Sequence, residues 1–286
     1  MVWGACLGSF LNVCIYRMPR EESVVTPPSR CPRCQHLIAW YDNLPLISFA
    51  LLRGACRHCR EPIRWRYPVV ELLTAVMTAA VLERFGAGWL GLIYLAFVCG
   101  LIVSNFIDLE FRIIPDEISL GGLAVGLACS VLIPALHQTD SRLVALGRSA
   151  LGMLVGGGVL YGTGAAGDLM LVSFRRLGVC LRHHPYWRGK LSRYRHMRES
   201  MGGGDVKLLA MAGSLLGWKL VLLTFFLAPF LALAPGVVML VLKRSHYIPY
   251  GPFLSVGLVV SLFFGEHILR ASGIEDAVRV LKEFYF

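Results

Sequence analysis

Two aspartates in this chain stand where an ionised side chain is costly. Asp108 follows the apolar run GLIVSNFI, and Asp205 closes the run MGGGD at the start of another apolar stretch. A carboxylate at a membrane boundary is unfavourable unless it is paired, hydrated or functional. An ionised aspartate can act as general base on a water, while a protonated one can polarise a carbonyl group. If these carboxylates meet, they cannot both ionise easily, and the pair predicts aspartyl-protease chemistry.

The run DLEFRIIPD around Asp108 predicts a break between two helices. Pro115 ends or bends a helix, so the chain is expected to turn back here. Asp116 is then expected to cap the next helix, because its carboxylate can accept from exposed backbone N–H groups. The simpler interpretation of Asp108 is a solvated helix end or a partner for Arg112.

Three glycines, Gly202, Gly203 and Gly204, directly precede Asp205. Glycine allows another chain to approach the backbone closely, so these residues are predicted to leave room for an extended substrate. The simpler interpretation is a flexible helix entry with Asp205 as the N-cap. The protease hypothesis therefore depends on both aspartates lying at the same membrane face.

Four cysteines form two CxxC pairs in the segment 17–68, which is rich in arginine and proline. Cys31 and Cys34 make the first pair, and Cys56 and Cys59 make the second. Two such pairs can complete a tetrahedral site, and four sulfur ligands favour a structural Zn²⁺. The alternatives are two disulfides or four free thiols, and a cytoplasmic location argues against stable disulfides.

The composition indicates the class of protein and the kind of elements that hold these residues. The chain has 286 residues, 56% of them hydrophobic, and a mean hydropathy of +0.62. That is too apolar for a soluble domain, so we expect an all-α polytopic membrane protein. The net charge of +10 lies in blocks between apolar segments, which argues against a nucleic-acid partner. Eight transmembrane helices are expected, at roughly 1–16, 69–83, 89–107, 117–135, 149–167, 205–217, 220–242 and 250–269.

The basic residues predict the orientation. If the N-terminus faces outward, 21 of the 28 Lys and Arg residues lie in inner segments, which places both aspartates on the cytoplasmic side. The expected organisation is a first helix at 1–16, a zinc-ribbon-like loop domain at 17–68, a peptidase core at 69–270 and a tail at 271–286. The first span begins at Met1 without a charged lead-in, which suggests a short or truncated helix.

Six motifs, taken together, resemble bacterial type IV prepilin peptidases of the GxGD membrane aspartyl protease family. They span residues 8 to about 254 and read GSFLNVCIYRMP, the paired CxxC loop with NLPLIS, RYPVVE, DLEFRIIPD, GGGDVKLLAMAG and IPYGPFL. The resemblance implies an inner-membrane endopeptidase that removes a basic leader from type IV prepilins or type II secretion pseudopilins. It also implies methylation of the new N-terminus with S-adenosylmethionine.

Carried over to this chain, the resemblance makes Asp108 and Asp205 catalytic and the four cysteines zinc ligands. The residues that bind S-adenosylmethionine stay unknown. Glu71 and Arg66 are candidates, and an ion pair that anchors a helix end explains them equally well. Open alternatives are a peptidase without methyl transfer, a transporter that uses the aspartates as an ion relay, and a zinc-ribbon scaffold for pilus assembly.

One segment departs from the family pattern. Residues 168–200 hold eight Arg or Lys and three His, where the family has a brief link. This composition predicts a basic helix lying on anionic lipid, with a solvated loop as the alternative. Membrane lipid is therefore expected as a partner alongside the protein substrate, and the oligomeric state is left open.

Overall fold

The computed structural model describes residues 1–180, 202–241 and 249–272. This part of the chain is mostly helical and contains no strand beyond two isolated bridges in the cysteine-rich loop. The long helices are α1 (Val2–Arg17), α3 (Arg66–Phe85), α4 (Trp89–Phe111), α5 (Asp116–Leu132), α6 (Arg142–Cys180), α8 (Gly203–Leu216), α9 (Trp218–Val241) and α10 (Gly251–Ala271). Each of the eight predicted apolar stretches thus matches one helix, except that 117–135 runs past the end of α5 into the 3-10 turn Pro134–His137.

Four helices are long and apolar enough to cross a membrane by length and composition: α4, α6, α9 and α10. The remaining long helices are shorter or carry more charge. The expectation of a helical membrane protein is confirmed to the extent that the described residues are mostly helical and four helices could cross a membrane. Whether all eight helices span the bilayer stays a prediction.

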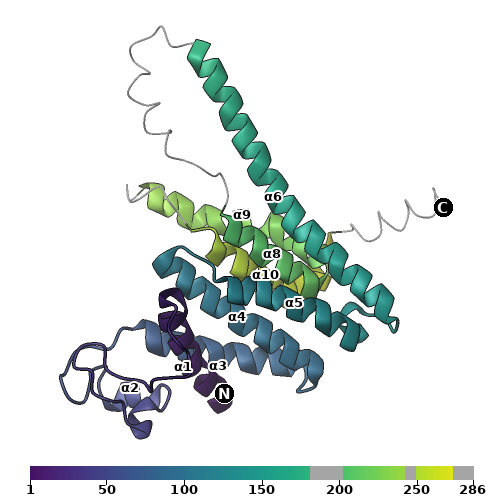
Figure 1. Cartoon of the computed structure of the whole chain (residues 1–286). Coiled ribbons are helices and arrows are strands. Elements are labelled where there is room, and N and C mark those ends of the chain that lie inside the picture. The colour runs from purple at the N-terminus through teal and green to yellow at the C-terminus, as the bar shows by residue number, and fades with distance from the viewer. Residues whose placement is uncertain (181–201, 242–248, 273–286) are drawn as a thin grey trace.

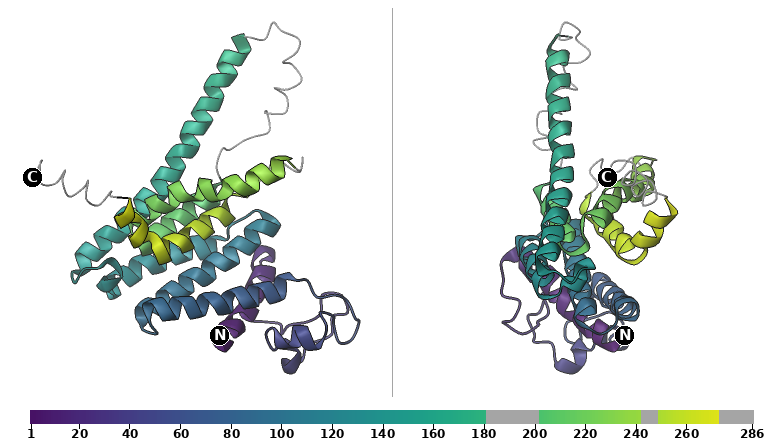
Figure 2. Two further views of the ribbon diagram at one scale, coloured as in Figure 1. Left: turned by 180° about the vertical axis from the view of Figure 1, so that it is seen from behind. Right: turned by 90° about the vertical axis from the view of Figure 1, so that its right-hand side faces the viewer.

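The helices pack side by side, as Figure 1 shows, with α3, α4 and α5 on one side and α8, α9 and α10 on the other. α6 packs against α8 and extends beyond the other helices in both Figures 1 and 2. The loop with the cysteines and the short helix α2 (Ile47–Leu51) lies at one end of this bundle, beside α1 and α3. The loop is thereby placed next to the helix ends that carry the candidate active site.

The predicted break in DLEFRIIPD is confirmed. α4 ends at Phe111, the left-handed Arg112 (φ 58°) reverses the chain, and α5 begins at Asp116 directly after Pro115. A left-handed residue costs strain unless surrounding contacts hold it. Here its N–H bonds the Asp108 carbonyl at 2.9 Å, which closes the last turn of α4.

Helices α1 and α3 approach closely through glycine. A Cβ on Gly8 would lie 2.6 Å from the Cα of Glu71, and one on Gly4 would lie 2.8 Å from the Cα of Ala75. Both obstacles are backbone atoms, which cannot swing aside. Small residues four apart on one face are a common means of close helix packing in membranes.

Replacing Gly8 with alanine is therefore expected to destabilise the protein. Overpacking of this kind costs about 2 kcal/mol, and we expect a lower thermal unfolding midpoint for the purified protein in detergent. Gly147→Ala is the matched control, because a Cβ there meets nothing within 4 Å. Equal midpoints for both variants would contradict the close α1–α3 contact.

Candidate active site and metal centre

Asp108 and Asp205 come together at Gly251, the first residue of α10. The Cβ position of Gly251 lies 2.6 Å from Asp108 Oδ2 and 3.4 Å from Asp205 Oδ1. One point is therefore within 3.4 Å of both carboxylates. Asp108 is buried in the last turns of α4, and Asp205 is half-buried in the first turn of α8. The structure thus brings the two predicted catalytic residues together.

The third contributor, Gly251, was not predicted. It lies in the motif IPYGPFL, which the sequence marked as a shared motif without assigning it a role. A side chain at this position would collide with the Asp108 carboxylate. The signal available in the sequence was a glycine that directly precedes a proline and an apolar helix, and this pattern alone does not indicate a partner.

The three glycines before Asp205 divide into two environments. Gly202 and Gly203 are exposed, and a Cβ on Gly203 would meet nothing within 4 Å. A Cβ on Gly204 would lie 3.0 Å from the Cβ of Ile114, in the turn between α4 and α5. Gly204 thus lets the start of α8 pack against the turn that follows Asp108. Room for a substrate stays a prediction for Gly202 and Gly203.

Asp116 does not cap α5, so that expectation is wrong. Pro115 occupies the N-cap position, and no side chain caps the helix. Asp116 instead lies in the first turn, where its two carboxylate oxygens accept from Lys207 Nζ at 2.7 and 2.9 Å. Because Lys207 is two residues after Asp205, this ion pair joins the start of α8 to the start of α5.

A second ionic contact joins the loop to α4. The Glu110 carboxylate accepts from Arg64 at 2.8 Å and from Arg66 through its other oxygen. Glu110 lies two residues after Asp108, so the two arginines hold the end of the helix that carries a candidate catalytic residue. Arg66 therefore pairs with Glu110 and not with Glu71.

Glu71 fixes the NLPLIS segment of the loop instead. It is buried on α3, and its Oε2 accepts the backbone N–H of Leu46 at 2.8 Å. Leu46 has φ 61°, a conformation that a non-glycine residue adopts only when contacts hold it. These contacts give Glu71 and Arg66 structural roles.

The four cysteines meet in one cluster. Their sulfur atoms all lie within 4.8 Å of one another, and Cys31 Sγ lies 3.8 Å from Cys59 Sγ. A tetrahedral zinc with bonds of about 2.3 Å places its sulfur ligands about 3.8 Å apart. The donor set and its spacing therefore fit Zn²⁺, and Cys31, Cys34, Cys56 and Cys59 would hold it.

Both CxxC pairs have the same backbone form. The Cys31 N–H donates to the His36 carbonyl, and the Cys56 N–H donates to the Glu61 carbonyl. Each turn passes through a left-handed residue, at Gln35 (φ 56°) and Arg60 (φ 58°). Two equivalent turns thus face each other across the cluster, as expected for a site in which each pair supplies two ligands.

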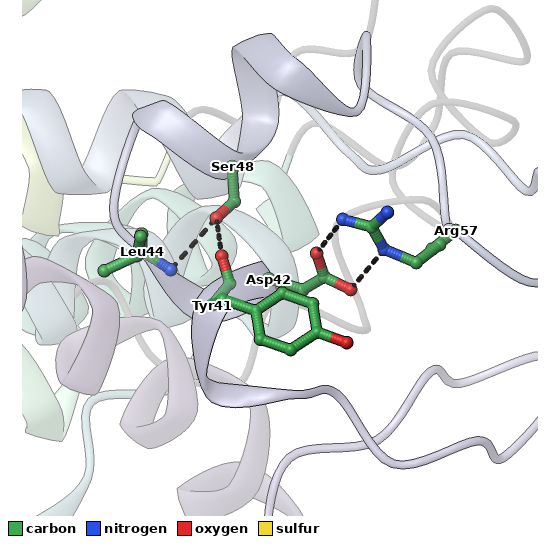
Figure 3. A network of polar contacts seen from close by, with 5 residues as sticks. All are labelled: Tyr41, Asp42, Leu44, Ser48 and Arg57. Atoms are coloured by element: carbon green, nitrogen blue, oxygen red, sulfur yellow. Dashed lines mark hydrogen bonds and ion pairs between the residues drawn. The ribbon is translucent and has the colours of Figure 1, made fainter.

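Polar contacts in the loop support the second CxxC turn (Figure 3). Arg57 donates through two nitrogens to the Asp42 carboxylate, and its hydrogen bond lowers the pKa of Asp42. Ser48 Oγ accepts the Leu44 N–H at 3.0 Å and donates to the Tyr41 carbonyl at 2.9 Å. The short segment between the two pairs is thereby tied to the turn that carries Cys56 and Cys59.

Two thiols of the cluster have shifted pKa values. Backbone N–H groups of Cys59 and His58 lower the pKa of the Cys56 thiol to about 7. The backbone N–H of Glu61 acts to lower the pKa of Cys59, but desolvation and the neighbouring thiols raise it to about 11.

Zinc binding is expected to weaken as the pH falls, because bound thiolates must compete with protons. We expect the purified protein to contain zinc and to lose it to a chelator faster at about pH 6 than at about pH 8. A Cys31→Ser, Cys56→Ser double variant should contain no zinc, whereas Cys6→Ser, outside the cluster, should keep it. Metal analysis that finds unchanged zinc in the double variant would refute the site.

The predicted basic insert at 168–200 lies largely outside the described residues. α6 continues through Cys180, so the first part of this segment is helical. The rest of this segment, 181–200 with His183, His184 and His196, lies outside the described residues, as does most of the expected tail at 271–286.

Comparison with known proteins adds an independent line of observation. The family described as "Bacterial Peptidase A24 N-terminal domain" matches residues 2–85, and the "Type IV leader peptidase family" matches residues 95–237. A protein of Aeromonas hydrophila, named prepilin leader peptidase/N-methyltransferase, is 33% identical over 291 residues, covering 92% of this chain and 89% of its own length. No solved structure matches the chain significantly.

Two further relatives carry the same name. The protein of Pseudomonas aeruginosa is 31% identical over 293 residues, which cover 93% of this chain and 90% of the relative. That of Myxococcus xanthus is 36% identical over 239 residues, which cover 84% of this chain and 62% of the relative. The similarity therefore extends over both the cysteine-rich loop and the helices that carry the two aspartates.

Proposed function

Because the chain belongs to the type IV leader peptidase family, we propose that Asp108 and Asp205 are the catalytic pair with which it cleaves prepilin leader peptides. The protein is a prepilin leader peptidase with N-methyltransferase activity. The observation that supports the catalytic assignment is the common contact at Gly251, which lies within 3.4 Å of both carboxylates.

Such a pair performs hydrolysis by proton transfer. The ionised aspartate removes a proton from a water, whose oxygen then bonds the scissile carbonyl carbon. The protonated aspartate donates a hydrogen bond to the carbonyl oxygen, and a proton then passes to the leaving amine as the C–N bond breaks. Close carboxylates share one proton, so Asp108 and Asp205 act as a unit with two combined ionisation steps.

The proposed orientation places this chemistry at the cytoplasmic face of the inner membrane, in a chain that spans it eight times. The protein is a multi-pass membrane protein by its apolar helices and its relatives. Two arginines of the loop contact the end of α4 beside Asp108, so the basic loop and the catalytic pair share one end of the bundle. The excess of basic residues in the predicted inner segments supports the cytoplasmic side for that end.

Type IV prepilins and type II secretion pseudopilins are the proposed substrates. Cleavage of a purified prepilin by the wild-type protein in liposomes tests this assignment, with mass spectrometry of the product. We expect a product that lacks the leader and begins at the residue after the leader glycine. No cleavage of either substrate class would overturn the proposed function.

S-adenosylmethionine is the proposed methyl donor for the second activity, and one described cavity has groups that suit it. This cavity of about 630 Å³ lies between α2 and the start of α3, and Arg53, Arg64, Phe49 and Trp65 are among the residues that line it. Pockets for small ligands typically have this size. Arg53 would hold the donor's carboxylate, because Arg64 already pairs with Glu110, and an aromatic ring would stack on its adenine.

Labelled methyl transfer to the cleaved product tests the activity, and binding of S-adenosylmethionine measured by calorimetry tests the cavity. Arg53→Ala and Trp65→Ala should weaken binding and leave leader cleavage unchanged. Active peptidase without any transfer would favour the alternative of a peptidase-only relative. Unchanged binding in both variants would place the donor elsewhere.

A further inference from the structure

Helices α4 and α10 run antiparallel from the catalytic pair to the opposite end of the bundle. Asp108 meets Gly251 at one end. At the other end, the Phe85 ring lies 4.6 Å from the Tyr94 ring of α4 and 6.0 Å from the Phe263 ring of α10. The two helices are in contact, so residues 94–108 of α4 run alongside residues 251–263 of α10 in reverse order.

This register places Ser104 opposite Ser255. Ser104 lies four residues before Asp108, and Ser255 lies four residues after Gly251, so each is one helical turn, about 6 Å, from the catalytic pair. Residues four apart share a helix face, so both serines continue the face that carries the Asp108–Gly251 contact. The next matched pair is apolar, because Leu101 and Leu258 are both buried. A polar layer thus lies between the catalytic pair and an apolar layer.

The two serine hydroxyls in this layer have no hydrogen-bond partner among the described residues. Ser104 is 2% exposed and Ser255 is 4% exposed, and both Oγ atoms are buried. Asp108 Oδ2, one turn away, is also buried and unpartnered. Five other buried hydroxyls donate to carbonyls three or four residues earlier in their own helices, whereas Thr78 Oγ1 on α3 also lacks a partner: the five are those of Thr74, Ser119, Ser130, Ser214 and Thr224. Ser104 and Ser255 do not use this partner.

We propose that Ser104 and Ser255 hold an ordered water one turn beneath the catalytic pair, and that this water hydrogen-bonds Asp108 Oδ2. A buried water needs two to four polar partners, and these three atoms supply that number. Buried hydroxyls are costly without a partner, which a water between them provides. The two serines are positioning residues: through the water they fix the orientation of the Asp108 carboxyl group. The proposal rests on the catalytic role of Asp108.

The test compares Ser104→Ala, Ser255→Ala and the double variant in prepilin cleavage. Loss of the water lets the Asp108 carboxyl group reorient, so each single variant should lower kcat about tenfold. KM should not change, because both serines are buried and cannot contact a bound substrate. The double variant should lose little more than either single one, since both changes remove the same water. Ser130→Ala is the control, because this buried hydroxyl donates within its own helix.

Thermal unfolding of the serine variants distinguishes a water-filled layer between Ser104 and Ser255 from one without water. If the hydroxyls were dry, alanine would remove an unsatisfied group, and each variant should unfold at a higher temperature than the wild type. We expect no such rise. Unchanged kcat in both single variants, or additive stabilisation in the double variant, would overturn the proposal. If the double variant does not fold, the kcat values of the two single variants test the proposal. Activity in Asp108→Asn would instead refute the catalytic pair, whatever the serine variants do.

Discussion

Replacing Asp108 with asparagine is expected to lower the kcat of prepilin cleavage by at least about a thousandfold, because asparagine can neither accept nor deliver the proton. Asp205→Asn should have the same effect. The double variant should be no less active than either single one, since residues that act as a unit do not contribute additively. Single-turnover assays of the purified variants in liposomes measure these losses.

Asp116→Asn is the matched control for Asp108→Asn. It removes a carboxylate from the same motif, and Asp116 pairs with Lys207 outside the catalytic contact. This ion pair is half-exposed, so its loss should reduce activity only slightly. All three variants should retain zinc and membrane insertion. Substantial cleavage by Asp108→Asn or Asp205→Asn would refute the catalytic pair.

Replacing Gly251 with alanine is expected to reduce cleavage about a hundredfold by displacing the Asp108 carboxylate. The added methyl group would lie 2.6 Å from Asp108 Oδ2, closer than any van der Waals contact allows. Either the carboxylate rotates away from Asp205 or α10 shifts. Both changes separate the groups that must share a proton.

Gly257→Ala, on the same helix, controls for a general effect on α10. Its Cβ would lie 3.3 Å from the terminal Cγ2 of Thr224, a side-chain atom that can adjust. We expect this variant to keep near-normal kcat. Equal losses in Gly251→Ala and Gly257→Ala would show that packing of α10, and not the contact with Asp108, accounts for the effect.

Local patterns in the sequence predicted the helices, the break at Pro115 and the four-cysteine cluster. Each of these depends on residues near one another in the chain, or on a strong shared chemistry such as four thiols. The pairing of Asp108 with Asp205 was predicted from their common position at helix ends. That reasoning needed only the orientation of the helices, and the structure brings the two together.

The contacts that sequence reasoning missed are all long-range. Asp116 has the residue type and position of a helix cap, yet it pairs with Lys207 on another helix. Arg66 and Glu71 are opposite charges in one motif, yet each has a different partner. The role of Gly251 depends on which helix α10 packs against. Charge and spacing along one segment do not contain this information.

The position of Gly251 also has a consequence for biosynthesis. Asp108 and Asp205 are both translated before α10, which supplies the Gly251 contact to the proposed catalytic pair. Contacts between segments far apart in the chain form late, because their loop-closure entropy must be overcome first. A nascent chain would therefore carry both carboxylates in the membrane and remain inactive until its last described helix inserts. This order would delay proteolytic activity until α10 has inserted.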